Sequence, residues 1–164
     1  MPKIQIETII NSKIEICFDL SRSIDLHKLS MSHTNEKAVA GRTSGLINLG
    51  EEVTWEATHF GIKQKLTSKI TLYDRPFHFR DEQVSGVFKS IIHDHYFEQR
   101  GKEALMKDIF DFESPLGAIG RIANKVFLSG YMTDLLTTRN GIIKECAETE
   151  KWKSVLSDIL NDML

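Results

Sequence analysis

A run of alternating residues from Glu51 to Glu113 constrains the fold more than any other feature of this sequence. Apolar and polar residues alternate through this stretch, and turns that contain Gly or Pro separate one candidate strand from the next. Side chains of a strand point alternately to its two faces. The pattern therefore predicts a meander of antiparallel strands with one buried face and one solvated face.

The stretch KQKLTSKITL, residues 63–72, shows how the faces are assigned. Lysines take three of its odd positions, whereas Leu66 and Ile70 take even positions. Because lysine is rarely buried, the even positions are expected to face the core. This face carries Gln64, Leu66, Ser68, Ile70 and Leu72.

The turns on either side extend this buried face into the neighbouring strands. A two-residue turn at 60–61 continues it into the preceding strand. A turn at 74–75 places Phe77 opposite Leu72 and continues it into the following strand. The inward side chains are then Val53, Trp55, Ala57 and His59 on the first strand, and Phe79, Asp81 and Gln83 on the third.

An aspartate lies on the buried face of the last strand, ALMKDIFDFE, residues 104–113. The charges of Lys107, Asp111 and Glu113 need solvent, which leaves the even positions buried and Asp108 among them. The buried set is Met106, Asp108, Phe110 and Phe112.

Two histidines on the preceding strand point the same way as this aspartate. A turn at 100–101 places His93 opposite Asp108. The same register places His95 opposite Met106. Ile91, His93, His95 and Phe97 then share the inner face. A β-bulge anywhere in the meander would reverse the faces of the strand residues beyond it.

Helical patterns surround the meander. A strand at 3–11 is followed by two short helices within 12–20 and 23–29, and a long helix is expected after Ser114 and Pro115. The tail WKSVLSDILNDML has the apolar spacing of an amphipathic helix. It either docks on its own domain or provides a dimer contact or partner surface.

Composition limits the classes of function. The chain has 164 residues, the size of one domain, and its net charge of -2 has no basic run suited to nucleic acid. Cys17 and Cys146 are the only cysteines, which favours reduced thiols rather than a disulfide framework. No apolar stretch is long enough for integral membrane association, and no leader is evident. We therefore expect a cytoplasmic protein.

Five stretches resemble the START-like superfamily, which includes polyketide cyclases, plant pathogenesis-related proteins and lipid-transfer domains. The chain is most similar to an uncharacterised bacterial branch of this polyketide cyclase-like (SRPBCC) group. The stretches are SRSIDLH (21–27), AGRTSGLINLGEEVTWEATHFG (40–61), PFHFRDEQVSGVFK (76–89), HDHYF (93–97) and FESPLGAIG (112–120).

The resemblance and the order of elements together predict an α+β helix-grip fold. A curved antiparallel sheet of six to seven strands would wrap around a long C-terminal helix, with two short helices after the first strand. The domain would span 1–147, and residues 148–164 would form an amphipathic helical extension. The resemblance also implies a cavity between sheet and helix that accepts an apolar or aromatic small molecule.

The inward polar side chains of the meander mark the candidate site. Each buried polar group left unpaired costs about 1–3 kcal/mol, so these groups must pair, hold water or meet a ligand. A mostly apolar pocket with a few convergent polar groups is typical of small-molecule sites. The expected ligand-binding residues are Trp55, His59, Phe79, Asp81, Gln83, His93, His95, Phe97, Asp108 and Phe110.

Four roles remain open for His93, His95 and Asp108. They form a closed polar network that fixes strand register, or they orient a ligand. They are also the candidate catalytic residues, since a histidine beside a carboxylate can act as an acid or base. His-x-His on a strand puts both rings on one face, so a metal site completed by Asp108 or His59 is the fourth role.

The function expected from this sequence is binding of a small hydrophobic or aromatic molecule, with no cofactor, no metal and no nucleic acid. The opening of the cavity is expected near the SPLG loop at 114–117 and the segment 28–45. One alternative is a cyclase or dehydratase that acts on a polyketide-like substrate. Another is an interaction module, such as a homodimer, that docks through the tail helix.

Overall fold

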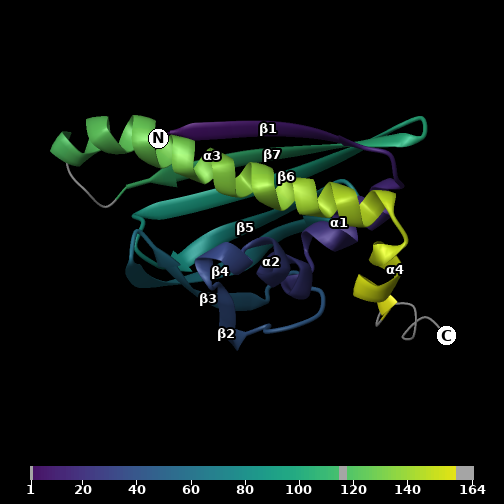
Figure 1. Cartoon of the computed structure of the whole chain (residues 1–164), viewed down its shortest axis with the longest axis horizontal. Helices are drawn as coiled ribbons and strands as arrows, with labels where there is room; N and C mark the ends of the chain where they lie inside the picture. The colour runs from purple at the N-terminus through teal and green to yellow at the C-terminus, as the bar shows by residue number, and fades with distance from the viewer. Residues whose placement is uncertain (1, 115–117, 158–164) are drawn as a thin grey trace.

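A single seven-stranded antiparallel sheet forms the body of the protein, and one long helix lies across its concave face (Figure 1). The computed structural model describes the backbone of residues 2–114 and 118–157, and the side chains of 2–114 and 127–157. The predicted helix-grip α+β fold is confirmed. The elements are β1 (Lys3–Ile10), α1 (Ile14–Ser21), α2 (Ile24–Ser30), the 3-10 helix η1 (Ser32–Thr34), β2 (Lys37–Gly41), β3 (Glu52–His59), β4 (Ile62–Asp74), β5 (His78–Ser85), β6 (Ser90–Arg100), β7 (Glu103–Glu113), α3 (Ala118–Glu148) and α4 (Lys151–Val155).

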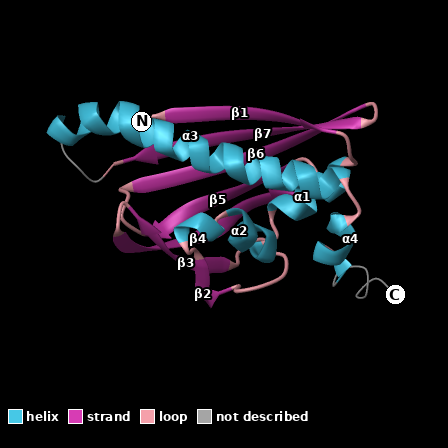
Figure 2. Cartoon of the chain, in the orientation of Figure 1, coloured by secondary structure: helices cyan, strands magenta, loops and turns pink. Residues whose placement is uncertain are grey.

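The strand order β1-β7-β6-β5-β4-β3-β2 places the first two strands at opposite edges of the sheet. Helices α1 and α2 make the connection between them, and both pack against α3 (Figure 2). The five strands β3 to β7 lie between these edges and are linked by hairpins, as the alternating sequence pattern predicted. The helices therefore cover one face of the sheet and leave the other to solvent.

The hairpin between β3 and β4 has the predicted register. Trp55 pairs with Leu66, and His59 pairs with Ile62. Both residues of the turn have a positive φ, 53° at Phe60 and 73° at Gly61. This is the backbone twist that two-residue hairpins require, and a bulky residue such as Phe60 adopts it rarely.

The hairpin between β4 and β5 differs from the prediction. Phe77 does not face Leu72, because Asp74 pairs with His78 and residues 75–77 form the connection. A β-bulge between Ile70 and Leu72 turns Leu72 outward, so that 44% of it is exposed. An extra residue in one strand reverses the faces beyond it.

The hairpin between β6 and β7 is also shifted from the prediction. Its turn residues are Gly101 and Lys102, so His95 rather than His93 lies opposite Asp108. Gly101 has a φ of 61°, which glycine adopts without strain. Moving a turn by one residue shifts the register by two, which leaves every side chain on its predicted face. His93, His95 and Asp108 are accordingly all buried.

The long helix α3 is confirmed from Ala118 to Glu148. The predicted capping by Ser114 and Pro115 involves residues 115–117, which lie outside the described part of the chain. Beyond α3, the described part of the tail packs on its own domain, because Leu156 of this segment is buried in the main core. The division into 1–147 and 148–164 stays a prediction.

An aromatic cluster fills the end of the concave face that α1 covers. The ring of Phe18, on α1, lies 5.4 Å from Tyr73, 5.3 Å from Phe79 and 5.3 Å from Phe97 between ring centroids. Phe18 has no exposed surface. Ile14 and Cys17 of α1 are buried beside Phe18, and Lys13 is the N-cap of this helix.

We predict that Phe18→Ala lowers the free energy of unfolding by about 3–5 kcal/mol, because the cavity cannot be refilled by its neighbours. Phe77→Ala is the matched control, since 55% of Phe77 is exposed, and its effect should stay within about 0.5 kcal/mol. Urea denaturation followed by circular dichroism measures both. Equal losses would contradict the placement of Phe18.

Candidate ligand-binding cavity

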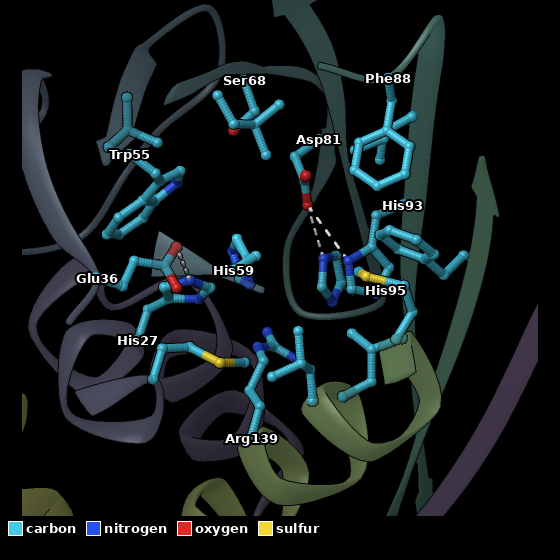
Figure 3. A pocket seen from close by; sticks show the side chains of 18 of the residues that line it. His27, Glu36, Trp55, His59, Ser68, Asp81, Phe88, His93, His95 and Arg139 are labelled. Carbon is cyan, nitrogen blue, oxygen red and sulfur yellow. Dashed lines mark hydrogen bonds and ion pairs between the residues drawn. The ribbon is translucent and has the colours of Figure 1, made fainter. Parts of the chain in front are cut away.

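A cavity of about 370 Å³ lies between the concave face of the sheet and the helices α2 and α3 (Figure 3). This volume is within the usual range of small-molecule sites. Aliphatic side chains from several elements form much of its wall, and polar side chains gather at two places. The aliphatic set includes Ile24, Ile47, Val53, Leu66, Ile70 and Leu135.

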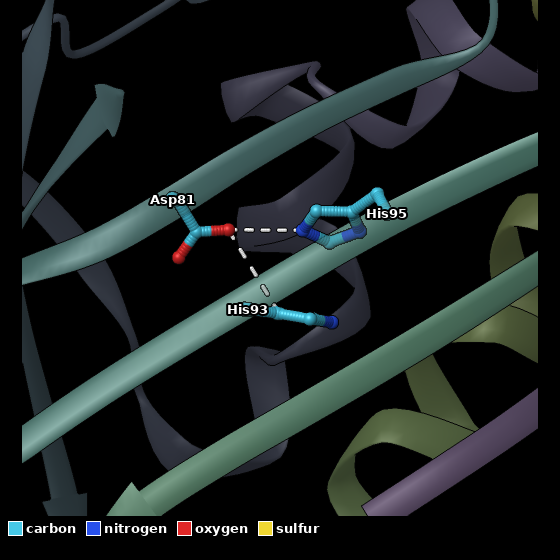
Figure 4. Close-up of side chains that lie close together, drawn as sticks. All are labelled: Asp81, His93 and His95. Atoms are coloured by element: carbon cyan, nitrogen blue, oxygen red, sulfur yellow. Dashed lines mark hydrogen bonds and ion pairs between the residues drawn. The ribbon is translucent and has the colours of Figure 1, made fainter. Parts of the chain in front are cut away.

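One polar group is built by the adjacent strands β5 and β6. Asp81 of β5 receives a hydrogen bond from Nε2 of His95 at 2.9 Å, and Nδ1 of His93 lies 3.8 Å from the same carboxylate (Figure 4). The two imidazole centroids are 3.8 Å apart. Phe79 stacks on the other face of His95 at 4.1 Å and 15°. The two rings are therefore fixed side by side with Asp81 in front of them.

Asp108 of β7 lies behind the histidines and is completely buried. Its Oδ1 is 2.9 Å from Nε2 of His93 and 3.0 Å from Nδ1 of His95, although the second contact is an ion pair rather than an aligned hydrogen bond. Its Oδ2 accepts a hydrogen bond of 2.6 Å from Nδ2 of Asn140. Arg139 lies 3.5 Å from Oδ1 and also donates to the carbonyl of Ser21 at 3.0 Å. Asp108 thus joins the sheet to α3.

The two carboxylates of this cluster are ionised. Burial opposes the charged form of Asp108, but its contacts with His93 and His95 outweigh it and hold its pKa well below the ordinary value of 3.8. Burial also opposes ionisation of Asp81, but the hydrogen bond from His95 and the nearby positive charges, Arg139 among them, together outweigh it and lower the pKa.

The two histidines are shifted in opposite directions. Burial and the neighbouring charge of His95 lower the pKa of His93 from 6.5. Burial would also lower the pKa of His95, but its contacts with Asp108 and Asp81 prevail and raise it above 6.5. With His95 charged and His93 neutral, His95 and Arg139 balance Asp81 and Asp108, so the cluster has no net charge.

A second polar group lies on the wall formed by β3 and α2. The ring of His27 lies 4.3 Å from Trp55 between centroids, and its Nε2 is 3.2 Å from Oε1 of Glu36. Nearby, Nδ1 of His59 and the hydroxyl of Tyr131 on α3 are 2.7 Å apart. Burial lowers the pKa of His59, which favours a neutral ring that accepts a hydrogen bond from the tyrosine hydroxyl.

Most of the predicted site residues line this cavity. These are Trp55, His59, Phe79, Asp81, His93, His95 and Phe110. Asp108 is set behind the histidines, and Phe97 belongs to the aromatic cluster around Phe18. The amide of Gln83 donates to the carbonyl of Phe88 at 2.7 Å and lies outside the cavity wall.

Sequence reasoning missed His27, Arg139 and Asn140. His27 is on a short helix whose pattern shows no sign of its contact with Trp55. Arg139 and Asn140 do carry a signal, because they follow Leu136 at the helical spacing of three and four residues. The expected opening near 114–117 and 28–45 stays a prediction: Ser114 and Glu36 line the cavity, but 115–117 lie outside the described residues.

Several solved structures resemble this chain. TTHA0849 from Thermus thermophilus matches with a TM-score of 0.68 at 16% identity, over 87% of this chain and 97% of that one. Ginseng major latex-like protein 151 from Panax ginseng gives 0.64 at 18%, over 90% and 97%. A START superfamily protein from Mycobacterium smegmatis gives 0.67 at 12%, over 87% and 97%.

These likenesses show that the chain has the START-like helix-grip fold. At such low identities they concern the fold alone. No protein-family model matches the sequence, and no curated protein matches it. No helix among the described residues is both long and apolar enough to cross a membrane.

We predict that His93 and His95 titrate on opposite sides of pH 6.5, the ordinary value for both. The proton of His95 stabilises the fold below pH 6.5, and this contribution is lost as the pH rises through its raised pKa. Because its pKa is lowered, His93 should stay neutral just below pH 6.5 in the folded protein. The unfolded chain binds a proton at this histidine in the same pH range, so the free energy of unfolding falls there.

Imidazole chemical shifts followed by NMR across pH 4 to 9 measure the two pKa values directly. The unfolded chain in urea is the control, because both rings should then titrate at about 6.5. Two indistinguishable midpoints near 6.5 in the folded protein would contradict the arrangement.

Proposed function

We propose that this protein binds a small, mostly apolar or aromatic molecule in the cavity between the sheet and α3, without covalent chemistry. The observation that carries the proposal is the cavity of about 370 Å³ with aliphatic walls and polar side chains at defined places. Apolar walls provide affinity through burial, and the few polar groups orient the guest.

The chemistry at Asp81 favours a ligand with a hydroxyl group. Its Oδ2 is engaged with His95, whereas its Oδ1 has no hydrogen bond to another described residue, and 25% of the side chain is accessible. An ionised carboxylate only accepts hydrogen bonds. A phenol or alcohol of the ligand would therefore be favoured there, and a carboxylate would be repelled.

The opposite wall favours a flat, unsaturated ring. Trp55 presents a large aromatic surface, and it is held in place by contact with His27, which is in turn paired with Glu36. Aromatic rings prefer offset or edge contacts with other rings. A hydroxylated aromatic compound would meet both requirements at once.

The second candidate function is a cyclase or dehydratase acting on a polyketide-like substrate, and one observation favours it. His95 lies between two carboxylates, and one of them, Asp81, is on the cavity wall. A proton could pass between His95 and the guest by way of Asp81. A preorganised cavity would also fold a flexible chain into a reactive shape.

The two functions are separated by His93→Gln and Asp108→Asn. Under catalysis, both substitutions should lower turnover of a polyketone substrate by orders of magnitude while the protein stays folded. Under binding alone, they should change affinity or stability only. Single-turnover assays with purified protein, followed by mass spectrometry of the product, distinguish the outcomes.

We predict that filling the cavity weakens binding. Ser68 lies on the buried face of β4 and lines the cavity, so Ser68→Trp should weaken binding of a neutral fluorescent probe such as N-phenylnaphthylamine about tenfold or more. Lys69→Trp, on the solvated face of the same strand, is the matched control and should bind as the unmodified protein does. Fluorescence titration measures both affinities.

Native mass spectrometry of the purified protein would show in addition whether a small molecule copurifies. Circular dichroism confirms that each variant is folded. Equal probe affinity in Ser68→Trp and Lys69→Trp would overturn the proposal that this cavity is the binding site.

A further inference from the structure

Three side chains at the polar end of the cavity are close enough to share one metal ion. Nδ1 of His93, Nε2 of His95 and a carboxylate oxygen of Asp81 all lie within 4.8 Å of one another. The oxygen is 2.9 Å from Nε2 of His95 and 3.8 Å from Nδ1 of His93. All three residues also line the cavity, where a ligand could reach them (Figure 3).

We propose that Asp81, His93 and His95 form a binding site for a divalent transition-metal ion of the Zn²⁺ type, with its open coordination positions facing the cavity. Metal bonds to imidazole nitrogen and carboxylate oxygen are about 2.0–2.2 Å long, so neighbouring ligand atoms around one ion lie roughly 3–3.4 Å apart. The separations of 2.9 Å and 3.8 Å bracket this spacing. Small rotations of the side chains would complete the geometry.

The position of Asp108 is the second observation that supports a metal site. It contacts Nε2 of His93 at 2.9 Å and Nδ1 of His95 at 3.0 Å, the nitrogens on the far side of each ring from Asp81. Metal-binding histidines characteristically direct their other ring nitrogen to a carboxylate, which fixes the tautomer and the orientation of the ring. One buried carboxylate does this for both rings here, and Asn140 holds that carboxylate in place.

The charges and donor types narrow the class of ion. Two imidazoles and one carboxylate suit Zn²⁺, Co²⁺ or Fe²⁺, whereas Ca²⁺ and Mg²⁺ prefer all-oxygen sites. With both rings neutral, the positive charges of a divalent ion and Arg139 exceed the negative charges of Asp81 and Asp108 by one. A further ligand with one negative charge, such as hydroxide, phenolate or enolate, would bring the sum to zero. The site would thus bind an ionised oxygen of the guest.

Metal binding goes beyond the binding of an apolar guest and does not depend on it. The test uses the full chain without a polyhistidine tag, treated with a chelator and then dialysed. Titration with Zn²⁺ by calorimetry should give one ion per chain. Titration with Co²⁺ should produce visible absorption bands from the bound ion, a readout that needs no activity.

Four substitutions make the test specific. Asp108→Asn should weaken Zn²⁺ binding about 10–100-fold, because it removes the orienting carboxylate. His95→Gln and Asp81→Asn remove ligands and should weaken binding further. His78→Gln is the matched control, since it removes a histidine that is 2.7 Å from Asp94 on the solvated face of the sheet, and it should leave Zn²⁺ binding unchanged.

Circular dichroism establishes that each variant is folded. If His95→Gln does not fold, Asp81→Asn tests the loss of a metal ligand in its place, because Asp81 is the less buried of the two residues. The proposal is overturned if the unmodified protein takes up no stoichiometric Zn²⁺, or if folded Asp81→Asn binds it as tightly. Probe fluorescence in the chelator-treated protein keeps the two proposals apart. Probe binding without metal uptake would overturn the proposed metal site and would still support the proposed apolar ligand site.

Discussion

The buried carboxylate of Asp108 is the constraint on which the rest of the structure depends. A charge with no exposed surface is tolerated only when it is paired and hydrogen-bonded on several sides. Its partners come from β6 and from α3, so satisfying the charge fixes where the helix crosses the sheet. It also sets the direction of both imidazoles. The position of the helix and the chemistry of the cavity thus have one physical origin.

The cavity exists because the concave face is filled unevenly. At one end, Phe18 and the aromatic rings around it occupy the space between α1 and the sheet. Beyond them, polar side chains of the sheet and aliphatic side chains of α3 line the cavity without filling it. The bulge in β4 between Ile70 and Leu72 adds to the local twist of the sheet. Space is therefore left where polar and aliphatic walls meet.

The faces of the meander could be predicted from the sequence, but the pairing of its strands could not. Side chains alternate between the two faces of a strand with a period of two. The inward direction of His93, His95 and Asp108 was therefore predicted correctly although the predicted register was wrong by two residues. Register depends on which residue takes the first position of a turn, and Gly101 takes it through a conformation that composition does not reveal. The prediction for Leu72 was wrong because nothing local marks the bulge before it.

The helical side of the candidate site was predicted less well than the sheet side. Asn140 and Gly141 are weak helix formers, yet α3 continues through them to Glu148. Asn140 is instead held by its hydrogen bond to Asp108, a contact between residues 32 positions apart. Tertiary pairing of this kind outweighs local preference, and a single sequence does not display it.

The tip of the β3–β4 hairpin lies beside the cavity and contacts α3. Phe60 adopts its uncommon backbone conformation there, and its ring lies 4.6 Å from Tyr131 and 5.5 Å from Phe127, both on α3. These contacts form an aromatic bridge from sheet to helix beside the cavity wall. A molecule held behind such a bridge would leave only as often as the rings part. The residence time of the complex would then be set by the hairpin tip, and the strength of binding by the interior, so each could change in evolution without the other.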